Sequence, residues 1–239
     1  MNKLLPISAS ALLLAASSFV NANGQAVRAT VDGSTVEIPL TTTAKEGAMS
    51  FDSTFEFPGA SFHVSGLLNP DPSIVYGLTV TDVGAPSSFS FLFSTPIVPT
   101  GPSTSAAAFV LGELTDATGD SVSITPLGSK LQQASVGLPL TSMNVDVGDA
   151  ASFPAGVPAI YPYGPFSEGP IAGPSGLWTE LQVTTAFTLS GEGDIADLRI
   201  GFAQIEKAQG VPDGGPGLAG MTTLCGILFG SRFVRRFKI

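Results

Sequence analysis

Apolar and polar residues alternate along much of the chain, and the alternation is clearest in residues 49–57. Every second position of this run except Ser53 is a large apolar residue, and the positions between them are polar or acidic. Successive side chains of a strand point to opposite faces of a sheet, so a period of two predicts a strand and not a helix. Residues 49–57 are therefore expected to form a half-buried strand.

Similar runs recur along the chain, separated by turn-forming residues such as Asn-Pro-Asp-Pro at 69–72. Asp32 and Gly33 stand between two runs and predict a hairpin, because both can take the positive φ angles of a type I′ turn. Residues 118–120 (Thr-Gly-Asp) predict a second hairpin loop. The other predicted strands are residues 27–31, 34–38, 61–68, 74–83, 87–94, 106–114, 121–127, 131–138, 143–147, 181–189, and a last one with Leu198, Ile200 and Phe202 on its apolar side.

Residues 149–176 interrupt this pattern with six prolines and five glycines. Proline has no amide hydrogen for a strand ladder, so regular pairing is not expected here, and a loop of this length is often a binding loop. Tyr161, Tyr163 and Trp178 lie in or beside it. These three are the candidate ligand-binding residues, since aromatic rings stack on sugars; the alternative is that they cap the edge of the core.

Short strands bounded by Gly, Pro and Asp predict an all-β fold, an antiparallel β-sandwich of jelly-roll type over residues 23–210. Alternation, as opposed to continuous apolar runs, favours antiparallel sheets with one solvated face. An immunoglobulin-like sandwich is the alternative, although that fold holds fewer strands than are predicted here.

The two ends of the chain have the composition of export signals. Residues 1–22 combine Lys3, an apolar stretch and small residues up to Ala22, which predicts a secretory signal peptide cleaved after Ala22. Residues 217–234 are apolar and predict a transmembrane helix, followed by a basic cytoplasmic end at 235–239. An anchor that is never cleaved is the alternative at either end. The basic cluster expected to stay in the cytoplasm is Arg232, Arg235, Arg236 and Lys238.

The body between these ends is acidic and almost free of reactive side chains. Residues 23–210 carry 18 acidic and five basic side chains, a formal charge of −13. Such a surface repels nucleic acid, so no nucleic-acid partner is expected. The only cysteine, Cys225, lies in the apolar tail, which excludes a disulfide, a cysteine-bound zinc and a cysteine nucleophile from the body.

Little in the body indicates catalysis. His63 is the only histidine, so a Ser-His-Asp triad would have to use it, but the sequence contains no Gly-x-Ser-x-Gly motif to supply the serine. His63 is therefore expected to be a surface residue. No enzyme activity is predicted, and no cofactor is expected. Carboxylates around two glycine turns could supply oxygen ligands to calcium. The alternative is that these acids are solvent-exposed turn residues that bind no ion, and no metal is assigned. These groups are Glu113, Asp116 and Asp120 around Gly119, and Glu192, Asp194 and Asp197 around Gly193.

The C-terminal stretch carries a specific resemblance. Residues 211–216 begin with Val211, Pro212, Asp213, Gly214 and Gly215 and are followed by the apolar segment and the basic cluster. This order resembles the PEP-CTERM class of bacterial sorting tails in its Val-Pro-Asp variant, whereas the usual motif is Val-Pro-Glu-Pro.

The resemblance implies that an exosortase-type membrane enzyme processes the chain at this motif. The protein would then pass from an inner-membrane-anchored intermediate to the cell envelope or the exterior, in bacteria that make exopolysaccharide. A structural or adhesive role is the expected function. The alternative is a carbohydrate-binding module or a weak glycan-active enzyme.

Overall fold

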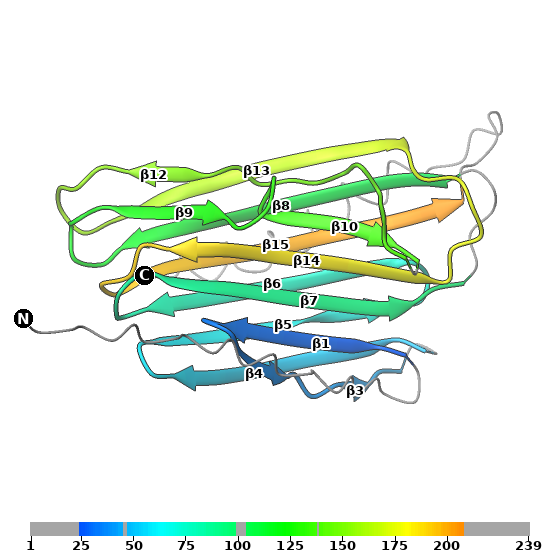
Figure 1. The fold of residues 1–239 in the computed structure, drawn as a ribbon, viewed down its shortest axis with the longest axis horizontal. Helices are drawn as coiled ribbons and strands as arrows, with labels where there is room; N and C mark the ends of the chain where they lie inside the picture. The colour runs from blue at the N-terminus through cyan, green and yellow to red at the C-terminus, as the bar shows by residue number, and fades with distance from the viewer. Residues whose placement is uncertain (1–23, 45–46, 99–103, 138, 208–239) are drawn as a thin grey trace, which may run out of the picture. The chain divides into compact units, whose positions relative to one another are not determined.

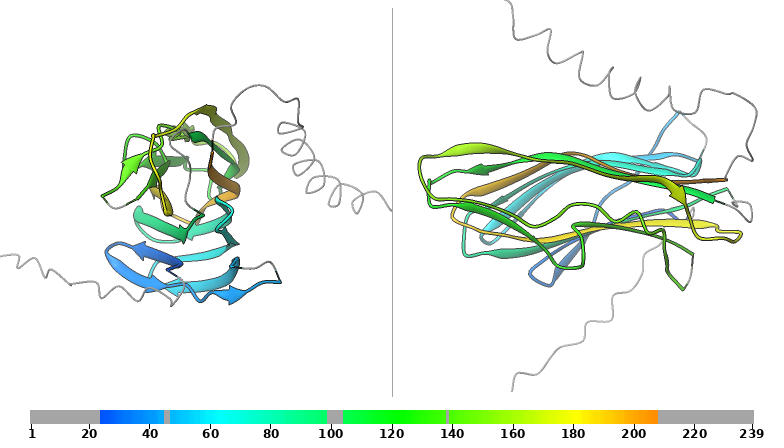
Figure 2. Two further views of the ribbon diagram at one scale, coloured as in Figure 1. Left: turned by 90° about the vertical axis from the view of Figure 1, so that its right-hand side faces the viewer. Right: turned by 90° about the horizontal axis from the view of Figure 1, so that it is seen from above.

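The computed structural model describes residues 24–44, 47–98, 104–137 and 139–207. These residues form 15 strands and no helix, arranged as two antiparallel sheets that pack face to face (Figures 1 and 2). The predicted all-β antiparallel sandwich is thus confirmed. The predicted signal peptide, sorting motif, transmembrane helix and basic end lie outside the described residues, and within these residues no helix could span a membrane.

One sheet, here called sheet A, has eight strands in the order β11-β10-β14-β7-β1-β2, with β9 also pairing β14 and β12 pairing β9. Most of its strands begin and end at the turns that the sequence predicts. Its members are β1 (Ala26–Val31), β2 (Ser34–Glu37), β7 (Ser87–Pro96), β9 (Val122–Pro126), β10 (Gln132–Val136), β11 (Thr141–Ser142), β12 (Ala151–Phe153) and β14 (Glu180–Leu189).

The other sheet, sheet B, has seven strands in the order β13-β8-β15-β6-β5-β4-β3. Three successive strands, β4, β5 and β6, pair as an antiparallel meander, and the longer β8 and β15 lie beside them. Its members are β3 (Thr41–Thr42), β4 (Met49–Phe57), β5 (Ala60–Asn69), β6 (Ser73–Asp82), β8 (Thr104–Asp116), β13 (Ala159–Ala172) and β15 (Asp194–Lys207).

The core lies between the two sheets and is rich in aromatic rings. Phe91 and Phe93 of β7 are fully buried and meet rings from sheet B. The Phe91 ring contacts Phe62 edge to face with centroids 5.1 Å apart, and Phe93 stacks on Tyr76 at 4.5 Å. Alternation along β7 directs Phe89, Phe91 and Phe93 inward and Ser88, Ser90 and Leu92 outward.

The first predicted hairpin is confirmed. Asp32 and Gly33 join β1 to β2 with φ angles of 46° and 84°, and Val31 pairs directly with Ser34. Two residues with positive φ are what a type I′ turn requires, and its twist matches that of the flanking strands.

The prediction of a loop over residues 149–176 is wrong. The segment contains β12 and the 14-residue β13, which pairs with β8 along the edge of sheet B. An edge strand needs hydrogen bonds on one side only, and irregular positions tolerate proline. The register shifts between Tyr163 and Phe166 and again between Glu168 and Ile171, so that the pairs at 164–165 and 169–170 (Gly-Pro) fall in these bulges.

The predicted hairpin at residues 118–120 is also wrong. The strand before it, β8, belongs to sheet B, and the strand after it, β9, belongs to sheet A. The turn therefore carries the chain from one sheet to the other. The predicted strand at 143–147 reduces to a single bridge between Val147 and Gln132.

Candidate functional site

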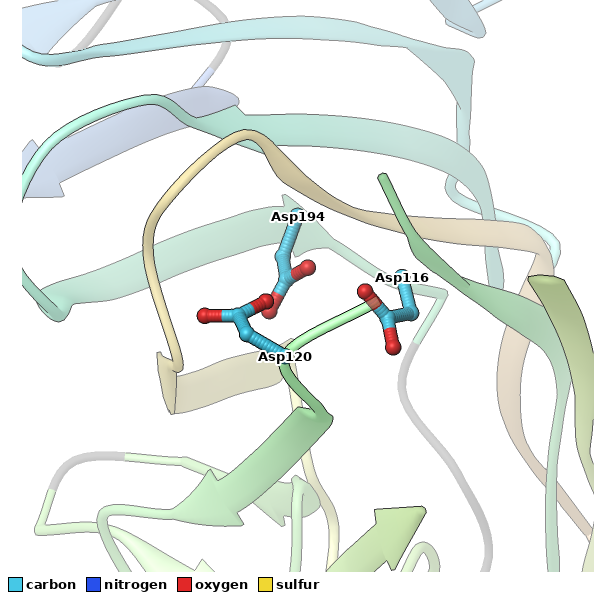
Figure 3. A group of neighbouring side chains, drawn as sticks. All are labelled: Asp116, Asp120 and Asp194. Atoms are coloured by element: carbon cyan, nitrogen blue, oxygen red, sulfur yellow. The ribbon is translucent and has the colours of Figure 1, made fainter. Parts of the chain in front are cut away.

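The acidic turns that the sequence separates meet at one end of the sandwich. Asp116 ends β8, Asp120 lies in the turn between the sheets, and Asp194 begins β15. One carboxylate oxygen from each of the three lies within 4.8 Å of the others. Figure 3 shows Asp194 between Asp120 and Asp116, with the carboxyl groups directed toward one another. We call Asp116, Asp120 and Asp194 the carboxylate cluster.

Asp116 holds the turn in shape. Its side chain is fully buried and accepts the N–H of Gly119 at 2.6 Å and that of Ser121 at 3.2 Å. Asp120 is exposed and accepts the hydroxyl of Thr118. The Asp116 carboxylate therefore fixes the backbone of the turn that carries Asp120.

Asp194 is the unusual member of the cluster. It is 1% exposed, and its Oδ2 accepts the hydroxyl of Ser190. Its Oδ1 is buried and has no hydrogen-bond partner among the described residues. A buried acceptor without a partner costs on the order of 1–3 kcal/mol. Native structures rarely retain such a group without a reason, so the position of this oxygen needs an explanation.

Negative charge is concentrated at this end, and no Lys or Arg of the described residues pairs with it. Burial raises the pKa of Asp194, and the nearby carboxylates of Asp120 and Asp116 add to the rise, while Ser190 and the Ala117 amide oppose it. The hydrogen bond with Asp120 raises the pKa of Glu192, whereas the pKa of Asp120 is lowered, first by its bond from Thr118 and then by that from Glu192. In the described ranges the ion pairs of Lys and Arg lie elsewhere: Arg28 with Glu37, Lys130 with Asp149, and Arg199 with Glu113 and Asp197.

A further buried carboxylate, Asp82 at the end of β6, pairs in register with Asp194. It differs from Asp194 because both of its oxygens are satisfied, by the amide of Ser87 at 2.7 Å and the Ser87 hydroxyl at 3.1 Å. Burial raises the pKa of Asp82, and the bonds from Ser87 oppose the rise. Asp82 is therefore explained as a turn residue, and Asp194 is not.

Three of the six acidic sequence candidates lie outside the cluster: Glu192, whose side chain interacts with Asp120, and Glu113 and Asp197, which point elsewhere. Glu113 precedes Asp116 by three positions on β8, and an odd spacing along a strand places two side chains on opposite faces. Glu113 accordingly pairs with Arg199, which also contacts Asp197. In the sequence, the acids fall into two groups around Gly119 and Gly193. In the structure, the acids that come together are those whose side chains lie on the same face and at the same end of the sandwich.

The aromatic candidates do not converge. Tyr163 is 1% exposed and donates its hydroxyl to the carbonyl of Asp149 at 2.6 Å, so its prediction as a ligand-binding residue is wrong. Tyr161 stacks on Phe153 with centroids 4.3 Å apart and planes at 6°, which joins β13 of sheet B to β12 of sheet A. Both rings serve the core or its edge, which is the alternative that the sequence analysis raises.

Trp178 lies far from these two rings. Its indole N–H donates to the carbonyl of Pro174 at 3.0 Å, and Thr104 at the start of β8 donates to the same carbonyl. Tyr161 pairs with Leu114 near the other end of β8. Thr104 and Leu114 are ten residues apart on β8, and at about 3.3 Å per residue roughly 30 Å of strand separates them. His63 is half-exposed and bonds Asp52 at 2.9 Å on sheet B, as a surface histidine would.

Comparison with known proteins adds little to this picture. No protein-family model matches the chain, and no curated protein matches it. The carbohydrate-binding module TmCBM61, solved with beta-1,4-galactotriose, is similar at 11% identity and a TM-score of 0.26 over 62% of this chain and 88% of that one. The enzymatically active domain of tailspike protein 4 from bacteriophage CBA120 is similar at 14% identity and a TM-score of 0.25, over 66% of this chain and 19% of that one. Overlap this weak supports no argument about function.

Proposed function

We propose that the chain is an exported, non-enzymatic surface or matrix protein with a C-terminal sorting signal, and that its β-sandwich has a structural or adhesive role. The observation that carries the proposal is the order of the last residues: the Val-Pro-Asp-Gly-Gly motif, then an apolar segment of about bilayer-spanning composition, then a basic cluster. The body suits this role because its closed aromatic core stands without a disulfide.

The residues of the motif fit a processing site. Proline, at 212, is a residue type that disfavours a helix at the position before it, and glycine, at 214 and 215, is disfavoured inside helices. This composition is the one expected of a segment that a membrane-bound enzyme processes. The basic cluster would remain on the cytoplasmic side, which places the acidic body on the other side. After cleavage the body would move to the envelope or the exterior, where exopolysaccharide is the associated polymer.

We also assign the sandwich to the jelly-roll type. Its support is the repeated passage of the chain between the sheets: the steps β6 to β7, β7 to β8, β8 to β9, β13 to β14 and β14 to β15 each change sheet. Such crossings distinguish a double-sheet roll from two separate meanders.

Deletion of residues 211–239 is expected to change both the size and the location of the protein in its host. The full chain should give a membrane-bound precursor and a smaller processed form, whereas the truncated chain should give one form that is released. Fractionation and immunoblotting measure both. Pro212→Ala with Asp213→Ala should abolish most processing, and Gln209→Ala, just outside the motif, should leave it intact. Identical size and location with and without the tail would refute the sorting role.

Carbohydrate binding is the second candidate, and only Trp178 now favours it. Its half-buried indole is fixed by Pro174 beside the exposed Leu177, and a rigid aromatic ring suits stacking on sugars. A glycan array probed with the full chain should lose its signal with Trp178→Ala and keep it with Tyr161→Ala, which changes a ring at the far end. The absence of any signal from the wild type would remove this candidate.

A further inference from the structure

The geometry points to a binding site for a divalent cation, Ca²⁺, formed by Asp116, Asp120 and Asp194 at the end of the sandwich. The inference concerns the body alone and does not depend on the sorting signal. It rests on three observations about the carboxylate cluster: the spacing of its oxygens, the unpartnered oxygen of Asp194, and the absence of an ion pair between the cluster and any Lys or Arg of the described residues.

The spacing suits one ion. Calcium binds oxygen at about 2.3–2.6 Å, so two oxygens on opposite sides of one ion are at most about 4.6–5.2 Å apart. The three carboxylate oxygens all lie within 4.8 Å of one another. Oxygens at these separations lie at most about 2.8 Å from a common centre, so small side-chain rotations bring all three into contact with a single ion.

The buried oxygen supplies the independent indication. Asp194 Oδ1 lies inside the protein and no described donor reaches it with hydrogen-bond geometry, although the Ala117 amide lies near enough to the carboxyl group to lower its pKa. The carboxyl group faces its two neighbours (Figure 3). A turn acid that only shapes the backbone has its oxygens satisfied, as Asp82 does with Ser87. A cation would give this oxygen the partner that the protein does not provide.

The chemistry of the ligands selects the class of ion. The cluster offers hard oxygen donors. The body holds no cysteine, and its single histidine, His63, bonds Asp52 and is not a member of the cluster, so zinc and copper are disfavoured relative to calcium. Calcium takes six to eight oxygens in a flexible geometry and readily completes its shell with water. Glu192, which is exposed and hydrogen-bonded to Asp120, is placed to add a fourth carboxylate.

The position of the site gives the ion a structural role. Asp116 and Asp120 belong to the turn that passes from sheet B to sheet A, and Asp194 follows the turn that returns from β14 to β15. One ion would thus tie both crossings together. It would also relieve repulsion at an end of the molecule where, in the part of the chain that the structure describes, no Lys or Arg pairs with the cluster.

The test measures the melting temperature of the full-length protein in mild detergent, first with a chelator and then with calcium or magnesium. Calcium at about 100 times its Kd should raise the melting temperature by roughly 5–10 °C, because a ligand that binds only the folded state stabilises it. Magnesium should give a smaller rise, since it demands a tighter octahedral shell. An equal rise with magnesium would overturn the choice of calcium.

Three variants separate a ligand role from a structural one. Asp194→Asn and Asp120→Asn should each lose most of the calcium-induced rise, while Asp52→Asn, which removes the same charge from sheet B, should keep it. Without calcium, Asp194→Asn should melt no lower than the wild type, because it removes a buried charge. If Asp194→Asn fails to fold, Asp120→Asn still tests the site, because an exposed residue such as Asp120 can be replaced without disturbing the core. No rise in the wild type at about 10 mM calcium, above the usual range for extracellular sites, or an undiminished rise in Asp120→Asn, would overturn the site.

Discussion

Replacing Gly201 by alanine is expected to lower the free energy of unfolding by about 3 kcal/mol, the upper end of the usual cost of overpacking. A Cβ atom at this position would lie 1.9 Å from Cζ of the Tyr76 ring. The ring cannot move away easily. It is 1% exposed, stacks on Phe93 at 4.5 Å, and its hydroxyl bonds Gln132 at 2.8 Å and Thr185 at 2.5 Å.

Chemical denaturation of Gly201→Ala and of Gly77→Ala would test this prediction. Gly77 is the neighbour of Tyr76 on β6, but its side of the strand faces outward, and a Cβ there would come no closer than 3.4 Å to other atoms. Alanine at 77 should change stability by less than about 1 kcal/mol, since it adds an ordinary contact and reduces the entropy of the unfolded chain. Equal losses from the two variants would show that the Tyr76 ring yields, contrary to the expectation.

The same region shows why sequence pattern alone misplaces part of β15. The alternation predicts Leu198, Ile200 and Phe202 on one face. In the structure the register shifts by one residue, between Leu198 and Gly201 in the pairing with β6 and between Asp197 and Ile200 in the pairing with β8. Leu198 is therefore buried, but Ile200 and Phe202 face outward. A bulge reverses which residues face the core. Its cause is the Tyr76 ring, which needs a glycine opposite it, and that contact cannot be seen from β15 by itself.

Strands with strong alternation were predictable because their pattern depends only on which face is buried. In β6, β7 and β14 most inward positions are apolar, and all three strands are confirmed; the polar exceptions are Asp82, Ser87, Thr95 and Thr185. The assignment of strands to sheets was not predictable, since residues 118–120 look like a hairpin loop whether the chain turns back or crosses over. The Gly/Pro-rich β13 was not predicted as a strand. Its prolines are tolerated because it lies at the edge of sheet B, and an edge position depends on the order of all the strands in the sheet, which the local sequence does not show.

The carboxylate cluster illustrates the same limit. The sequence identifies both acidic turns, and it names all three members of the cluster. The sequence does not predict that β8 pairs with β15, which brings the two turns together. It also does not predict the burial that leaves Asp194 Oδ1 without a hydrogen-bond partner among the described residues. Burial of a carboxylate depends on contacts between distant segments, so no local signal distinguishes Asp194 from Asp197.

Phe93→Ala is expected to cost about 3–5 kcal/mol, as the loss of a fully buried ring commonly does. Phe93 belongs to sheet A, and it stacks between Phe51, at 5.6 Å, and Tyr76, both from sheet B. Its removal leaves a cavity at the point where the two sheets meet. Since a domain of this kind is stable by only about 5–15 kcal/mol in total, the loss should be evident as a large fall in the denaturation midpoint.

Phe109→Ala is the matched control for this prediction, because it removes the same atoms from the outward face of β8, where the ring is only half-buried. We expect a cost of about 1–2 kcal/mol there, in proportion to the smaller apolar area that returns to water. Phe93→Leu should fall between the two, since it refills part of the cavity. A loss from Phe93→Ala no larger than that from Phe109→Ala would mean that the sheets close over the missing ring, and that their aromatic contact does not hold the sandwich together.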